Sequence, residues 1–149
     1  MTKQCMTYKV ISLLLSYPEK EIQDSGKEFI KEIKSEKLLS RGALKGIEEF
    51  IYWMESLELL DLQENYVDLF DRKKSLSLYI FEHIHGDSKE RGQAMVDLLN
   101  MYKHQGMEAL PSELPDYLPL FLEFLSTLPQ KEAKKLLKEP LDILGLIQA

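Results

Sequence analysis

The sequence predicts an all-α fold. Apolar residues recur at intervals of three and four along most of the 149 residues, which is the spacing of one helical face. No stretch shows the strict alternation or the Asn-Gly and Asp-Gly turns that are typical of β-sheets. The length is that of one ordinary domain, and 44% apolar content is enough for one core. We therefore expect a single helical domain over residues 1–149.

The first helix is expected to close near Pro18, which biases Tyr17 away from the helical region. Its apolar residues are Met6, Val10, Leu13, Leu14 and Tyr17. The run from Val10 to Leu15 is too short to span a bilayer, and no small-residue cleavage site follows it. We interpret the segment as a core helix and expect no membrane insertion and a cytoplasmic location.

Three more helices are expected before residue 72. Their apolar stripes are Ile22, Phe29, Ile30 and Ile33, then Leu44, Ile47, Ile51 and Met54, then Leu59, Leu62, Tyr66, Leu69 and Phe70. Gly26 is a weak point in the second helix, and residues 40–42 interrupt the helical pattern before the third helix. A residue near Ser56 is expected to cap the fourth helix, because a hydroxyl there can accept an otherwise unpaired backbone amide.

The second half of the chain continues the helical pattern. The run Leu76 to Phe81 fits a helix through Tyr79, Ile80 and His83. A longer helix is expected from Ser88 to Gln105, ended by Gly106, with a buried stripe of Ala94, Met95, Leu98, Leu99 and Tyr102. The next helix tolerates Pro115 and Pro119 at its start and ends at Pro129, and two short pieces follow, Lys131 to Lys138 and Leu141 to the terminus.

Charge and motifs exclude several classes of function. The net charge of −6 argues against a nucleic-acid binder and favours neutral or basic partners. No phosphate-binding glycine loop and no Gly-x-Ser-x-Gly elbow is present, so we expect no enzyme and no bound cofactor. The single cysteine, Cys5, cannot form an internal disulfide, which indicates a reducing compartment.

Charged residues around apolar runs predict a peptide groove. Asp71, Arg72 and Asp87 flank the run Leu76 to Phe81 with charges of both signs, as at the rim of a peptide-binding surface. A second, acidic patch is expected from Glu113, Asp116 and Glu123 beside Tyr117, Phe121 and Phe124. The series His83, His85 and Asp87 leaves open an alternative, a metal- or nucleotide-dependent helical enzyme, although no second cluster completes a metal shell.

Two long segments carry a resemblance to a known family. They are similar to the respiratory nitrate reductase assembly chaperones of the NarJ type, also called the nitrate reductase delta subunit. The first segment runs from Tyr66 through Phe70-Asp71-Arg72 and LSLYIFEHIHGDSKERGQAMVDLL, and the second is ELPDYLPLFLEFLSTLP. The short run LLLSYP near the start is similar to the opening of the same family. Glu113, Pro115 and Asp116 resemble the Glu-Pro-x-Asp-His signature of the wider TorD-like molybdoenzyme chaperones, with Tyr117 in place of the histidine.

The resemblance implies a helical bundle of the molybdoenzyme-chaperone type. It implies a system-specific chaperone that binds the N-terminal segment of the apo catalytic α subunit of nitrate reductase and keeps it competent for molybdenum cofactor insertion and membrane docking. The residues expected to form or support the client groove are Phe70, Asp71, Arg72, Tyr79, Glu82, His83, His85, Asp87, Glu113, Pro115 and Asp116. A helical adaptor for an unrelated partner is a further alternative.

Family members usually continue past the point where this sequence stops, inside an apolar pattern that includes Leu144 and Ile147. We expect either a C-terminally truncated chain or a short family member. If further helices are missing, that apolar surface predicts self-association.

Overall fold

The computed structural model describes residues 5–73, 76–81, 89–107 and 114–138. Regular secondary structure in these ranges is helical, with one isolated β-bridge, which confirms the all-α class predicted from the sequence. None of the helices seen in these ranges is both long enough and apolar enough to cross a lipid bilayer.

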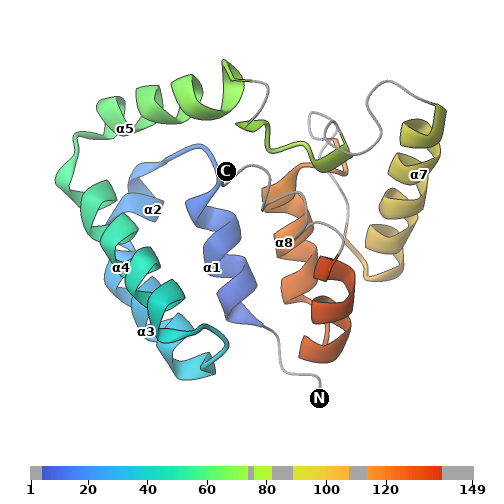
Figure 1. Cartoon of the computed structure of the whole chain (residues 1–149), viewed down its shortest axis with the longest axis horizontal. Coiled ribbons are helices and arrows are strands. Elements are labelled where there is room, and N and C mark those ends of the chain that lie inside the picture. The colour runs from blue at the N-terminus through green and yellow to red at the C-terminus, as the bar shows by residue number, and fades with distance from the viewer. Residues whose placement is uncertain (1–4, 74–75, 82–88, 108–113, 139–149) are drawn as a thin grey trace.

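The centre of the core is the pair α1 (Met6–Leu14) and α8 (Leu118–Ser126), which lie side by side in Figure 1. Phe124 and Leu125 of α8 are 2% and 0% exposed, and Val10 of α1 is 2% exposed. The expectation of a core helix at the start of the chain is therefore confirmed. The expected stripe is wrong at its two ends, because Met6 and Tyr17 are exposed to solvent.

The second predicted helix is in fact two helices, α2 (Lys20–Asp24) and α3 (Gly26–Glu36), with a break at Ser25. Gly26, the first residue of α3, lies very close to α4 (Arg41–Ser56). A Cβ atom at position 26 would lie 2.6 Å from Cγ2 of Ile51, which is fully buried. Only glycine lets the start of α3 pack this closely against α4.

Helix ends in this half are fixed by side chains. Ser40 caps α4, since its Oγ accepts a hydrogen bond from the Ala43 amide at 3.2 Å. The buried Gln23 side chain donates to the carbonyls of Met54 and Leu57, so it satisfies the other end of α4. The expected side-chain cap near Ser56 is wrong, because the residue at the start of the next helix is Glu58, whose side chain forms no cap hydrogen bond, and Ser56 is the last residue of α4.

The fourth predicted helix has an irregular end. It comprises α5 (Leu59–Tyr66) and a π-helical turn, η1 (Val67–Asp71), in which the Arg72 amide donates to the Val67 carbonyl at 3.2 Å. Beyond it, the predicted helix over Leu76 to Phe81 is wrong at Tyr79, which forms an antiparallel β-bridge with Tyr117. The helical periodicity does not produce a helix at Tyr79, because its backbone pairs with the extended backbone just before α8.

The remaining helices agree with the sequence prediction. In α7 (Lys89–His104), Leu98 and Tyr102 are buried, and Gly106 follows with a φ of +76° that suits glycine at a helix end. α7 lies at one edge of the molecule beyond α8 (Figure 1). After α8, residues 130–138 are helical, as expected. The last predicted piece, Leu141 to the terminus, lies outside the described residues.

Candidate functional site

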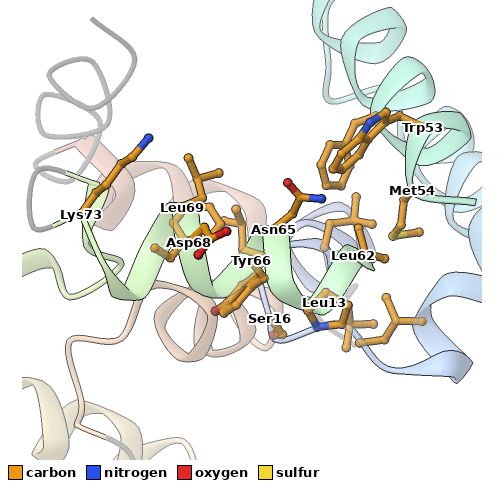
Figure 2. A pocket seen from close by; sticks show the side chains of 16 residues that line it. Leu13, Ser16, Trp53, Met54, Leu62, Asn65, Tyr66, Asp68, Leu69 and Lys73 are labelled. Carbon is orange, nitrogen blue, oxygen red and sulfur yellow. The ribbon is translucent and has the colours of Figure 1, made fainter. Parts of the chain in front are cut away.

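An apolar groove with a volume of about 400 Å³ lies between the C-terminal end of α1, α4 and the α5–η1 segment. We call it the groove. Figure 2 shows side chains from all these elements around it. Its apolar lining includes residues of α1 (Leu13, Leu14), α4 (Phe50, Trp53, Met54), α5 (Leu62, Tyr66) and η1 (Leu69, Phe70).

The mouth of the groove is unusually apolar for a surface. Phe50, Trp53 and Leu69 are 39%, 44% and 42% exposed. The rings of Phe50 and Trp53 pack together, with their centroids 5.7 Å apart. A cluster of exposed large apolar side chains with polar residues at its edge is typical of an interaction site.

The polar edge of the groove is formed on α5, η1 and the residues just after them. Asn65, Asp68 and Lys73 line it, and Figure 2 shows Lys73 at the opposite end from Trp53. Asp68 pairs with Arg72 at 2.6 Å, and both side chains are mostly exposed. Such a pair contributes little to stability because water screens it, so Asp68 can exchange Arg72 for another cation at small cost.

The π-helical turn shapes this wall of the groove. η1 contributes Asp68, Leu69 and Phe70 to the lining, and the ring of Phe70 packs on Tyr66 with centroids 5.0 Å apart. π-helical turns are rare and frequently occur at functional sites. The place of η1 in the groove wall agrees with a role in binding.

Tyrosine side chains link the groove to the β-bridge. The hydroxyl oxygens of Tyr66 and Tyr117 are 2.7 Å apart, and the rings of Tyr117 and Tyr79 lie 5.2 Å apart. Burial, and then the hydrogen bond to Tyr117, raise the pKa of Tyr66 far above the ordinary tyrosine value. The Tyr66 hydroxyl therefore serves as a neutral hydrogen-bonding group and not as an acid.

The residues predicted from the sequence fall into two places. Phe70 lines the groove, and Asp71 and Arg72 are exposed beside it. Tyr79, Pro115 and Asp116 lie at the bridge. The other predicted residues, Glu82, His83, His85, Asp87 and Glu113, lie outside the described residues.

Asp116 has a structural environment that the sequence did not suggest. It is 0% exposed, and its Oδ2 accepts a hydrogen bond from the Phe81 amide at 3.0 Å. Glu123 of the same expected acidic patch forms a 2.6 Å ion pair with Lys9. The expectation that Asp116 belongs to a surface patch is wrong, and Glu123 is occupied by a cation of the chain itself.

Sequence reasoning missed most of the groove. Ile51 and Met54 of α4 were assigned to the core correctly, but Phe50 and Trp53 beside them widen the apolar face beyond what a core stripe needs. The width of this apolar face was the one feature of α4 from which the sequence could have indicated an exposed binding surface. The part played by Leu13 and Leu14 had no sequence signal, since it depends on where α1 ends relative to α4.

The metal-site alternative receives no support from the described part of the chain. No group of three or more His, Cys, Asp or Glu side chains there is arranged to hold a metal ion. The series His83, His85 and Asp87 lies outside that part, so this alternative stays untested. Cys5 is buried, and burial raises the pKa of its thiol, which is the opposite of what a reactive thiolate requires.

An all-helical fold with an aromatic-walled groove and a polar edge is typical of a helical binding protein. The family model of the nitrate reductase delta subunit matches residues 37–146. The chain belongs to this family, which confirms the resemblance seen in the sequence.

Curated relatives carry consistent names. The chain is 41% identical over 140 residues to the nitrate reductase molybdenum cofactor assembly chaperone NarJ of Escherichia coli K12, covering 94% of the chain and 59% of the relative. It is 42% identical to the probable chaperone NarW of the same organism, covering 93% and 57%. It is 31% identical to the probable chaperone NarJ of Bacillus subtilis 168, covering 93% and 74%. These relatives are named as chaperones rather than enzymes, and the chain spans about three-fifths of the length of the E. coli proteins.

Proposed function

We propose that the chain is a cytoplasmic, system-specific assembly chaperone for nitrate reductase. It binds the N-terminal segment of the apo catalytic α subunit and keeps that subunit competent for molybdenum cofactor insertion and membrane docking. The observation that carries the proposal is membership of the delta-subunit family, together with the names of relatives up to 42% identical over nearly the whole chain. It catalyses no reaction and holds no cofactor of its own.

The groove supports the proposed mode of binding. An amphipathic helix of the client would place apolar anchors in the groove, where the aromatic rings of Phe50 and Trp53 and the side chain of Leu69 are already exposed. Buried aromatic residues carry most of the energy of such interfaces. The net charge of −6 favours a basic segment over an acidic one, and the edge of the groove offers one charge of each sign, Asp68 and Lys73, to the partner.

The predicted site residues then take two roles. Phe70 is proposed to contact the client in the groove, and Asp71 and Arg72 to contact it at the edge. Tyr79, Pro115 and Asp116 are proposed to support the groove without touching the client. The roles of Glu82, His83, His85, Asp87 and Glu113 stay proposals from the sequence alone.

Titration with a synthetic peptide tests this function. The peptide covers the N-terminus of the nitrate reductase α subunit from the same organism, and calorimetry is run at two salt concentrations. Trp53 is the single tryptophan of the chain and lines the groove, so its fluorescence reports occupancy independently. We expect stoichiometric binding that weakens with salt.

A matched pair of variants locates the site. Trp53→Ala is expected to weaken binding by about 10-fold or more, because it removes an aromatic anchor. Tyr52→Ala is the control, since Tyr52 is an exposed aromatic residue on the same helix and does not line the groove. Equal affinity losses in the two variants would contradict the groove assignment, and a folded chain that binds no peptide would contradict the client assignment.

A further inference from the structure

We infer that Tyr66 and Tyr117 couple the groove to the β-bridge, so that client binding and the integrity of the bridge reinforce each other. The inference deepens the proposed function and rests on it, because the groove is the proposed client site. It makes Tyr117 a positioning residue, which acts through Tyr66 and does not contact the client.

On the groove side, Tyr66 is held in one orientation. Its ring meets the edge of Tyr17 with centroids 5.7 Å apart and an interplanar angle of 85°, and it packs on Phe70 at 5.0 Å. Tyr66 and Phe70 both line the groove. A client that packs on this wall therefore further restrains the direction in which the Tyr66 hydroxyl points.

On the bridge side, Tyr117 is part of a dense network. The Leu118 amide donates to the Leu78 carbonyl at 2.7 Å, and the Ile80 amide donates to the Asp116 carbonyl at 3.0 Å. The buried Asp116 carboxylate fixes the Phe81 amide, and the Tyr102 hydroxyl donates to the Pro115 carbonyl at 2.6 Å. Movement of Tyr117 cannot leave this network unchanged.

The hydroxyl pair joins the two sides. Tyr66 and Tyr117 are 51 positions apart in sequence, and their 2.7 Å contact is partly buried. Removal of the Tyr117 hydroxyl takes from the partly buried Tyr66 hydroxyl its hydrogen-bond partner in the described part of the chain, which costs more than the bond is worth when both groups are present. Because coupling between two sites is reciprocal, a ligand that stabilises the groove through this hydrogen bond also stabilises the bridge by the same free energy.

Amide hydrogen exchange tests the coupling without any ligand. The amides of Ile80, Phe81 and Leu118 report the bridge, and amides of α4 serve as the internal reference. Tyr66→Phe is expected to speed exchange at the bridge amides by about fivefold and to leave α4 unchanged, from the usual value of one hydrogen bond. Unchanged bridge exchange, or an equal acceleration in α4, would overturn the inference.

Tyr17→Phe is the matched control for that experiment. Tyr17 packs on the same ring, but its hydroxyl takes part in no hydrogen bond seen in the described part of the chain. We expect this variant to exchange like the wild type at the bridge. Acceleration equal to that of Tyr66→Phe would mean that ring packing, and not the hydroxyl pair, connects the two sides, and would overturn the inference.

Peptide titration then gives the reciprocal measurement. Tyr66→Phe and Tyr117→Phe are each expected to weaken binding of the α-subunit peptide by about fivefold, and the double variant no more than either single one. Saturating peptide should slow bridge exchange in the wild type only. Additive losses would overturn the coupling. If the wild type binds no peptide, the proposed client fails, and the exchange experiment on the free chain still decides the coupling.

Discussion

Helix α8 and the α5–η1 segment are both rich in apolar residues, yet these residues are mostly buried in α8 and mostly half-buried or exposed in α5–η1. In α8, Phe121, Leu122 and Leu125 are 5%, 4% and 0% exposed. In α5 and η1, Leu60 and Leu69 are 67% and 42% exposed. The same kind of side chain thus builds the core in one region and an open surface in the other.

The difference arises from how many neighbours cover each element. α8 is packed against α1 along its length, and Tyr102 of α7 lies on Phe124 with ring centroids 4.9 Å apart. In the described part of the chain, Leu62 is the buried residue of the α5–η1 segment. The Gln63 side chain ties this segment to the loop after α1, since it donates to the Pro18 carbonyl at 2.9 Å. Large apolar residues that stay exposed, such as Leu60 and Leu69, are available to a partner.

The largest expected effect follows from the core of α8. Leu125→Ala should lower the free energy of unfolding by about 2–5 kcal/mol, because it leaves a cavity among fully buried side chains. Leu60→Ala is the matched control and should change that free energy by less than about 0.5 kcal/mol, since Leu60 is mostly exposed. Urea denaturation measures both. Similar losses of unfolding free energy in the two variants would contradict the difference between the buried α8 and the exposed face of α5.

A smaller effect is expected where α3 approaches α4. Gly26→Ala should destabilise the chain by about 1–3 kcal/mol, because the new Cβ would press on the buried Ile51. Gly46→Ala, inside α4 with nothing within 4 Å of the added Cβ, should instead stabilise it by about 0.5–1 kcal/mol. Thermal unfolding of the pair gives the sign of each effect, and a stable Gly26→Ala variant would show that the close packing is not needed.

The smallest effect concerns the start of α1. The Glu36 carboxylate at the end of α3 accepts hydrogen bonds from the Met6 amide at 2.7 Å and from the Thr7 amide and hydroxyl at 2.5 Å. Glu36→Gln should cost about 1 kcal/mol, because it removes a negative charge and an acceptor from a helix N-terminus. Glu32→Gln on the exposed face of α3 should be neutral. Denaturant titration at low salt distinguishes them, and equal losses would argue against a cap supplied by Glu36.

Much of the fold was predictable from local signals. The ends of α4 and α7 follow from Ser40 and Gly106, which act on the adjacent backbone alone. The break before α3 was visible only as a weak point at Gly26, because the close packing of this residue against Ile51 involves a helix 25 residues later in the chain. The helix expected across Tyr79 was wrong for the same reason, since its pairing partner is Tyr117.

The candidate site was predictable only in part. Phe70 was predicted for a client groove from the apolar pattern and from a segment shared with a known family, and it lines the groove described above, while its contact with a client stays a prediction. Phe50, Trp53 and Leu69 were missed or assigned to the core, because periodicity shows which residues share a face but not whether another element covers that face. Asp116 was mistaken for a surface acid because burial of a carboxylate depends on distant backbone donors such as the Phe81 amide.

By itself, the sequence determined the helical class, most helix boundaries and the family to which the chain belongs. Those properties depend on residue spacing, on capping and helix-breaking residues next to each helix, and on continuous segments whose sequence is similar to that of the family. Only the tertiary structure decided which apolar faces are covered, that Asp116 is interior, and that Tyr66 meets Tyr117. These depend on contacts between residues far apart in the chain, which local patterns do not encode.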